Sequence, residues 1–238
     1  MKYDILYIKG RPSINRDEEL RYSLRSLQRY CYNYNRIFIT GECPDFINLR
    51  KVIYTKEKDI GCPMINHWWK VHQTIKNTDI SQNFVLMYDD IFFMGCQDMM
   101  KIPAYFKGFL ESARSGGSLY QESLHNAEYW LMKNGHSTYD FELHKPIIYN
   151  RKKFLKLEKI FRPLMNDNPA MAVRSIYGNL FEKMPTYKED IKIREADFRV
   201  ENLSALHTCC SVSDKAFSCH VLPWLKENFQ TKSRYERS

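Results

Sequence analysis

Apolar residues in the first hundred positions form short runs that alternate with amphipathic stretches. The runs, each bounded by turn residues, predict strands at 3–8, 36–40, 52–54 and 83–87. A stripe of apolar residues at helical spacing predicts a helix that begins near Asp17, and Pro63 suits the first position of another helix that ends near Lys76. This alternation predicts an α/β fold with a mixed, mainly parallel central sheet flanked by helices.

The pattern after residue 100 indicates fewer strands and more helices. It predicts helices at 152–161, 171–181 and 222–229, and a strand at 191–193. The 238 residues fit one domain with a helical C-terminal elaboration.

Two adjacent carboxylates interrupt the most apolar segment of the chain. Residues 83–94 have the character of a strand buried on both faces, and Asp89 and Asp90 fall in its middle. Buried charge is unfavourable unless it is paired or bound to a metal. Because Mg²⁺ and Mn²⁺ prefer carboxylate oxygens and substrate phosphates, the pair predicts a metal site where the strand ends. The alternative is a solvated turn between two strands of a hairpin.

The predicted strands end in loops at 9–13, 41–44 and 89–90. In parallel sheets of this class, ligands bind beyond the carboxyl ends of the strands. The loop at 9–13 contains Gly10 and Arg11, so we expect both near a bound donor. The three loops would share one edge, which predicts a single active site.

Composition and charge restrict the function further. Hydrophobic residues make up 44% of the chain, but no run approaches the roughly 18 apolar residues of a membrane helix. The start of the chain enters a strand without the features of a signal peptide, so we expect a cytoplasmic protein. Seven cysteines, with no Cys-x-x-Cys spacing, indicate neither a zinc site nor a disulfide framework. The net charge of +8 favours partners rich in phosphate or other anions.

Several polar residues are candidates for contact with a nucleotide donor. Arg21 and Arg25 share one helix face, where two guanidinium groups suit a diphosphate; the alternative is a pair of surface arginines. Asn66 lies in the first turn of the helix that begins at Pro63, where free backbone N–H groups attract phosphate.

Two residues of the second half are candidates for chemistry. His144 precedes Lys145-Pro146 and would act as a general base or steady a phosphate, unless it is structural. Asp214 is either the cap of a following helix or a distant metal ligand.

These segments resemble, in order, the blocks of the Stealth family of sugar-phosphate transferases. Residues 17–27, DEELRYSLRSL, resemble the family motif DELRYSLRS, and residues 84–93, FVLMYDDIFF, resemble FIYFNDDFF. RIFITG at 36–41 is similar to the strand that follows the first of these motifs. His144-Lys145-Pro146 and Arg174-Ser175 resemble the third block, and Ser213-Asp214 with 222–236 resembles the fourth without its proline.

The resemblance implies a GT-A-type core that binds a nucleotide sugar, with a divalent metal (Mn²⁺ or Mg²⁺) at Asp89 and Asp90 and a contribution from Asp214. It also implies catalytic roles, which fall on Asp90, His144, Arg174 and Arg21. The expected donor is a sugar linked to uridine diphosphate, with residues 1–100 as the nucleotide-binding half and residues 101–238 as the acceptor-side half.

The resemblance is weaker at the first block of the family. Of the family sequence DVVYTWVDG, this chain keeps Asp4, Tyr7 and Gly10. These three residues, with Arg11, Arg25 and Asn66, form the expected donor-binding set. The helix after Pro63 also departs from the family, because Trp68 and Trp69 replace small residues there.

The sequence leaves the reaction and the acceptor open. The family transfers sugar-1-phosphate, whereas a glycosyltransferase transfers the sugar alone, and metal and arginines would serve either reaction. The acceptor is a glycan hydroxyl or, for a compact phage-type enzyme, hydroxymethylated DNA, with Lys145, Lys152, Lys153 and Lys156 as candidate phosphate contacts. A basic nucleic-acid-binding module without enzymatic activity is the remaining alternative.

Overall fold

The computed structural model describes residues 2–10, 14–113, 117–165, 170–190, 192–194 and 208–237. Its central sheet has the strand order β4-β3-β1-β5-β9. These strands are β4 Val52–Thr55, β3 Tyr34–Gly41, β1 Tyr3–Lys9, β5 Asn83–Tyr88 and β9 Ile147–Asn150. All neighbours are parallel except β9, which pairs antiparallel with β5. The mixed, mainly parallel sheet predicted from the sequence is therefore confirmed.

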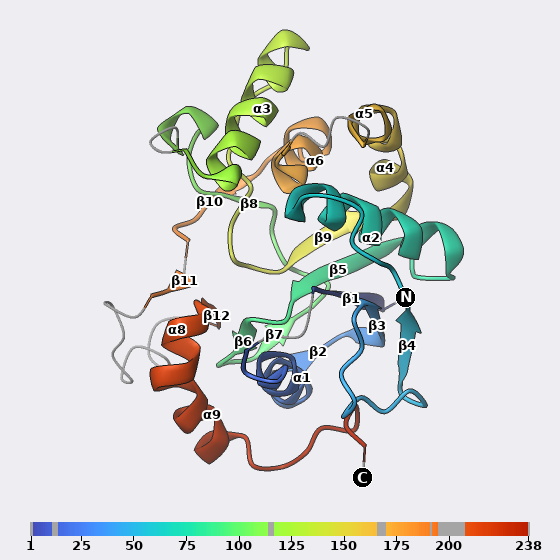
Figure 1. Cartoon of the computed structure of the whole chain (residues 1–238), viewed down its shortest axis with the longest axis vertical. Helices are drawn as coiled ribbons and strands as arrows, with labels where there is room; N and C mark the ends of the chain where they lie inside the picture. Colours follow the sequence, from blue (N-terminus) through green and yellow to red (C-terminus); the bar gives the residue numbers. More distant parts are fainter. Residues whose placement is uncertain are drawn as a thin grey trace.

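Helices cover both faces of this sheet (Figure 1). One face carries α1 Glu18–Tyr30, α8 Asp214–Ala216 and α9 Leu222–Asn228. The other carries α2 Pro63–Asn77, α3 Leu119–Lys133, α4 Arg151–Leu155, α5 Glu158–Leu164 and α6 Val173–Phe181. The four strands and two helices predicted in the first hundred residues thus lie where the apolar pattern placed them, as β1, β3, β4, β5, α1 and α2.

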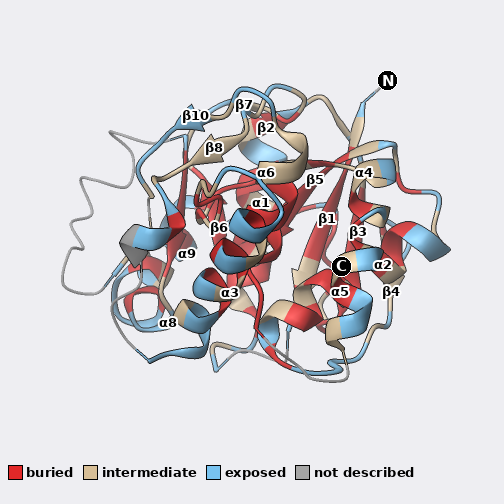
Figure 2. Ribbon diagram, turned by 90° about the horizontal axis from the view of Figure 1, so that it is seen from above, coloured by how far each residue is buried: buried red, intermediate tan, exposed pale blue. Residues whose placement is uncertain are grey.

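The alternation of side chains along the strands builds two cores. In β1, Ile5 and Tyr7 belong to the core beneath α1, whereas Leu6 belongs to the core beneath α2. Residues in β3 and β5 alternate in the same way, because successive side chains of a strand point to opposite faces. Figure 2 shows these central strands as buried and the outer faces of the helices as exposed.

The second half differs from the sequence prediction in several elements, and the strands β8, β9 and β10 are among those not predicted. The predicted helix at 152–161 is two helices, α4 and α5, which a turn at Lys156 and Leu157 separates. The side chain of Asn150 caps the start of α4. Helix α3 was not predicted; a capping box formed by Ser118 and Gln121 begins it. Strand β12, Cys209–Val212, was also missed, because its short run pairs only with other short strands.

Short strands pair outside the central sheet. One small sheet has the order β11-β12-β6, from β11 Lys192–Ile193 and β6 Ile91–Phe93. Two further pairs join β2 Cys31–Tyr32 to β7 Gln97–Asp98, and β8 Tyr105–Phe106 to β10 Thr186–Tyr187. A 3₁₀ turn spans Leu110–Ala113, and a π-helical turn spans Phe217–Val221.

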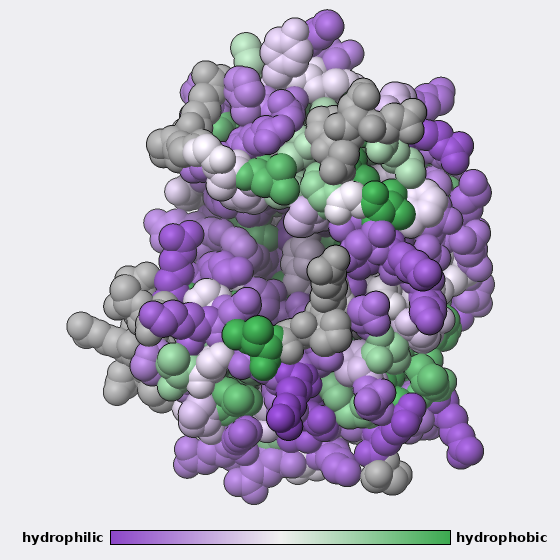
Figure 3. Space-filling model, viewed as in Figure 1, coloured by the Kyte–Doolittle hydropathy of each residue, from purple (hydrophilic) through white to green (hydrophobic). Residues whose placement is uncertain are grey.

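The visible surface of the molecule is mainly hydrophilic. In Figure 3, hydrophobic residues form separate groups on this face and no continuous band. Within the described residues, no helix has both the length and the apolar character needed to cross a membrane.

Candidate active site

The carboxyl ends of β1 and β5 lie side by side at the switch point of the sheet. The chain moves from β1 outward to β3 and β4, and then crosses through α2 to β5 on the other side of β1. Ile8 pairs with Tyr88, so Lys9 and Gly10 leave one strand beside the point where Asp89 and Asp90 leave the other. Ligands of open α/β sheets bind at such a point.

Asp89 pairs with a buried lysine, Lys9, that was not predicted from the sequence. The Nζ atom of Lys9 lies 2.8 Å from Oδ1 of Asp17 and 3.2 Å from Oδ2 of Asp89. The side chain of Lys9 is 2% exposed, so its charge depends on these two carboxylates. Burial raises the pKa of Asp89 to about 6; Lys9 opposes this shift, and the nearby charges of Asp90 and Glu19 add to it.

Asp90 is held by residues from two other strands. The hydroxyl of Ser211 in β12 donates to Oδ2 of Asp90 at 2.7 Å, and Nζ of Lys192 in β11 lies 3.5 Å from the same oxygen. The small sheet β11-β12-β6 therefore fixes the side chain of Asp90. A lysine beside each aspartate reduces the repulsion between the two carboxylates.

Both aspartates face a cavity of about 350 Å³, which we call the carboxylate cavity. Its walls bring together the predicted residues Asp89, Asp90, His144, Arg174 and Asp214. The remaining lining residues are Glu19, Tyr88, Tyr120, Glu142, Leu143 and Lys192. Residues more than a hundred positions apart thus meet around one space of mixed charge.

His144 is oriented by a carboxylate. Its Nδ1 atom lies 2.7 Å from Oδ2 of Asp190, and its backbone N–H donates to Oδ1 of the same residue at 2.8 Å. Although burial acts in the opposite direction, the hydrogen bond and charge of His144 hold the pKa of Asp190 below its usual value. A ring fixed through Nδ1 leaves Nε2 as the atom that can exchange a proton.

Arg174 brings a buried guanidinium group to the same cavity. The residue is 3% exposed, and Nη2 donates to the backbone oxygen of Lys145 at 2.9 Å. The guanidinium carbon lies 5.8 Å from the ring centroid of Tyr88. Its Nε atom has no hydrogen-bond partner among the described residues. Arg174 therefore retains a donor, as a residue that binds an anionic ligand requires.

A second cavity of about 370 Å³ adjoins the first and shares Tyr88, Tyr120 and Glu142 with it. We call it the Asn66 cavity, since Asn66 and Gly10 line it. The amide of Asn66 is engaged by the preceding loop: it accepts from the backbone of residues 60 and 61 and donates to the oxygen of residue 61. Asn66 thus shapes the wall of this cavity with its side chain.

Lys70 closes another side of the Asn66 cavity. Its ammonium group donates to the backbone oxygen of Lys9 at 2.9 Å and lies 2.6 Å from Oδ1 of Asp59. Nδ1 of His67, on the same helix, shares a hydrogen bond of 3.0 Å with the hydroxyl of Tyr88. Burial lowers the pKa of His67 to about 3, so this imidazole is neutral.

Arg21 and Arg25, predicted as catalytic and diphosphate-binding residues, contact the C-terminal segment instead of either cavity. Nη1 of Arg21 lies 2.9 Å from Oε2 of Glu236, and Nη2 of Arg25 lies 2.8 Å from the same oxygen. The sequence placed both arginines on one helix face, and this arrangement is observed. Their shared ligand is a carboxylate of the chain itself.

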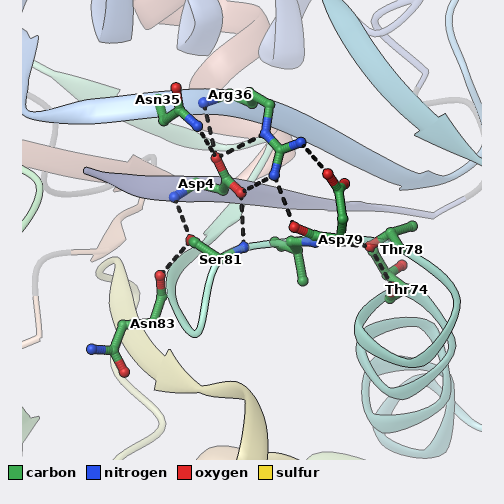
Figure 4. A network of polar contacts seen from close by, with 9 residues as sticks. Asp4, Asn35, Arg36, Thr74, Thr78, Asp79, Ser81 and Asn83 are labelled. Atoms are coloured by element: carbon green, nitrogen blue, oxygen red, sulfur yellow. Dashed lines mark hydrogen bonds and ion pairs between the residues drawn. The ribbon is translucent and has the colours of Figure 1, made fainter. Parts of the chain in front are cut away.

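Tyr7 and Asp4, predicted near the donor, also lie outside the two cavities. Tyr7 is fully buried, and its hydroxyl lies 3.0 Å from that of Ser23 in α1. Asp4 lies at the amino end of β1, where Arg36 pairs with it at 2.8 Å and the backbone N–H of Ser81 donates to it (Figure 4). Arg36 also pairs with Asp79. Arg11 lies outside the described residues.

Several residues of the site were not singled out from the sequence. They are Lys9, Tyr88, Glu142, Asp190, Lys192 and Ser211. A lysine at the end of an apolar strand was the available signal for Lys9, because such a buried ammonium requires a carboxylate. The others depend on contacts across the sheet that local sequence does not report.

The carboxylates suit a hard divalent cation in their chemistry. No group of three or more His, Cys, Asp or Glu side chains in the described part of the chain is arranged to hold a metal by itself. Within that part, the contacts of Asp89 and Asp90 engage Oδ2 of each. The Oδ1 atoms fit a cation that takes one or two carboxylates and completes its ligands with substrate phosphate.

The fold of the chain is similar to that of a solved glycosyltransferase. A crystal structure of the galactosyltransferase LgtC, in complex with donor and acceptor sugar analogues, superposes with a TM-score of 0.52. The alignment covers 97% of this chain and 98% of LgtC at 12% sequence identity. This likeness confirms the predicted GT-A-type fold.

The sequence comparisons give no assignment. No protein-family model matches the chain. No curated protein matches it either. Membership of the Stealth family stays a prediction from the motifs at 17–27 and 84–93.

Proposed function

We propose that the protein is a metal-dependent transferase that moves a glycosyl or sugar-1-phosphate group from a nucleotide sugar to an acceptor hydroxyl. The observation that carries this proposal is the position of Asp89 and Asp90 at the switch point of a GT-A-type sheet, facing the carboxylate cavity. A binding module without catalysis has no need for a half-buried acidic pair that shares a cavity with a fixed histidine and a buried arginine.

The two adjoining cavities suit the two parts of a nucleotide-sugar donor. The Asn66 cavity, beside the end of β1, would hold the nucleoside, which we take to be uridine. The diphosphate and sugar would extend past Tyr88 into the carboxylate cavity, where Arg174 and Lys192 supply positive charge. Residues 1–100 would then bind the nucleotide, while residues 101–238 would supply most of the acceptor side.

Asp89 and Asp90 would hold Mn²⁺ or Mg²⁺ together with the donor phosphates, and Asp214 lines the same cavity. When bound, the cation neutralises charge on the leaving phosphate. Lys9 and Ser211 keep the two aspartates in place. His144, which Asp190 orients, would accept the proton of the acceptor hydroxyl.

A glycan hydroxyl is the acceptor that this arrangement supports best. Of the lysines considered as DNA contacts, Lys152 and Lys156 line a groove over α4 and α5, and Lys145 lines a different cavity. Helix α4 follows β9, and the last residue of β9 pairs with the first residue of β5. The groove over α4 therefore begins at the amino end of β5, whereas the carboxylate cavity lies at its carboxyl end. These positions do not favour DNA at the carboxylate cavity.

Chromatography of nucleotide products tests the proposal. The purified protein would be incubated with a panel of nucleotide sugars, Mn²⁺ or Mg²⁺, and glycan acceptors, with hydroxymethylated DNA as a further arm. Release of a nucleoside diphosphate indicates glycosyl transfer, and release of a monophosphate indicates sugar-phosphate transfer. Product that forms equally without metal, or equally in the Asp90→Asn variant, would overturn the proposed mechanism.

A further inference from the structure

A third cavity, which we call the Lys145 cavity, lies apart from the two described above. It has a volume of about 170 Å³, roughly half that of either neighbour, and shares no lining residue with them. Its walls are Gln97, Ile102, Pro103, Tyr105, Lys145, Pro146, Lys188, Thr208 and Cys209. Cavities for drug-sized ligands start near 300 Å³, so this one suits a smaller group.

Lys145 is buried beside this cavity without a counter-charge. The residue is 6% exposed, and within the described residues its ammonium group makes no hydrogen bond or ion pair. The ring of Tyr105 lies near this ammonium group, with its centroid 5.9 Å from Nζ. The nearby carboxylate of Asp190 is engaged by His144 at 2.7 Å and by Lys107 at 3.5 Å. A buried ammonium in this position requires an anion.

The other lining groups also favour an anion. Lys188 adds a second positive charge. Burial lowers the pKa of Lys145, and the charge of Lys188 acts in the same direction. Tyr105 and Thr208 offer hydroxyl donors, and no Asp or Glu lines the cavity. Two lysines with hydroxyl groups form a set of donors that matches the oxygens of a phosphate group.

We propose that the Lys145 cavity binds a phosphate group through Lys145 and Lys188. The proposal does not depend on the transferase function. The site is joined to the carboxylate cavity through two short paths: Lys145 follows His144 and accepts a hydrogen bond from Arg174, and Cys209 lies two residues before Ser211, which holds Asp90. A bound phosphate therefore stabilises the segments that position His144 and Asp90.

Thermal unfolding of the full chain tests the site. Inorganic phosphate would replace sodium chloride at constant ionic strength, and the Tm would be followed for the wild type and for Lys145→Met. We expect a saturable rise of Tm in the wild type and an at least tenfold weaker apparent affinity in the variant. Without phosphate, Lys145→Met should be as stable as the wild type or more stable, because it removes a buried unpaired charge.

Two further variants separate this site from general attraction to a basic protein. Lys188→Gln should weaken the phosphate response, whereas Lys152→Met, in the groove over α4 and α5, should leave it unchanged. A parallel titration with glycerol 3-phosphate distinguishes a phosphate group carried by a larger molecule from the free ion. A rise of Tm equal to that with inorganic phosphate indicates a site for a terminal phosphate group. No rise of Tm indicates a site for the free ion. An absent response in the wild type, or an equal response in Lys145→Met, would overturn the proposal.

Discussion

Asp89 and Asp90 show how adjacent identical residues acquire different surroundings. Asp89 faces Lys9 from its neighbouring strand, and Asp90 faces Ser211 and Lys192 from a separate sheet. The sequence predicted an acidic pair at a strand end, and the structure places it there. It did not predict the two lysines, because a local pattern contains no information on which distant side chain will approach.

Asp90→Asn should lower transferase activity at least a hundredfold, because the amide removes a negative charge that a cation requires. The fold should persist, since asparagine can still accept the hydrogen bond from Ser211. Product release and thermal unfolding would be measured side by side. Glu227→Gln, at an exposed site on α9, is the matched control and should behave as the wild type.

His144→Ala should lower kcat by a factor of about 10² to 10⁴, the range typical of a lost general base. Asp190→Asn keeps the ring but removes the carboxylate that fixes Nδ1, so its loss of kcat should be smaller. Measurement of kcat against pH separates the two roles. If His144→Ala kept the wild-type kcat and pH profile, the histidine would be structural.

At the scale of elements, helix α6 positions the segment that carries Glu142 and His144. The backbone N–H of Ser175 donates to Glu142, and the hydroxyl of Ser175 accepts from the backbone of Phe141. Phe141 lies directly over Gly178, where an added Cβ would come within 2.4 Å of the ring. The sequence indicated the helix, but the requirement for glycine depends on a ring 37 positions earlier (178 minus 141).

Gly178→Ala should therefore destabilise the protein by about 1–3 kcal/mol, despite the higher helix propensity of alanine. The reason is that the added methyl group would overlap the ring of Phe141, which is fully buried. Urea unfolding would measure the change. Gly117→Ala provides the control, since nothing lies within 4 Å of its added Cβ; an equal effect at both positions would contradict the packing argument.

At the scale of the whole molecule, the C-terminal segment joins the first helix through one buried carboxylate. The side chain of Glu236 is 1% exposed, pairs with Arg21 and Arg25, and accepts hydrogen bonds from Ser233. The two arginines matched a known motif, and their shared face was predicted from their spacing. Their partner lies more than 200 residues away, which explains why the sequence suggested a diphosphate ligand.

Glu236→Gln should lower the free energy of unfolding by about 3 kcal/mol at neutral pH, because it leaves Arg25 without its counter-charge and Arg21 with Glu18 alone. Glu227→Gln should have little effect, since surface substitutions change stability by less than about 0.5 kcal/mol. Guanidinium unfolding of both variants would be compared. If Glu236→Gln lowered the free energy of unfolding as little as Glu227→Gln, the contact of Glu236 with Arg21 and Arg25 would contribute nothing to stability.

The contact of Glu236 with the two arginines also predicts that stability depends on pH. Arg25 and the Ser233 backbone outweigh the opposing effect of burial and hold the pKa of Glu236 below its ordinary value of 4.5. Its contribution to stability is therefore present above pH 4.5 and is lost as the pH falls through the lowered pKa. The stability difference between wild type and Glu236→Gln should shrink over this acidic range. A difference independent of pH would contradict the assignment.

The sequence by itself determined the order of β1, α1, β3, β4, α2 and β5, and the acidic pair at the end of β5. These follow from local apolar patterns and from the requirement that buried charge be satisfied. Tertiary structure decided which charges meet: Lys9 with Asp89, Glu236 with Arg21 and Arg25, and His144 with Asp190. Ionic contacts act over a few ångströms in space, and chain separation places no limit on them, so only the packed fold selects the partners.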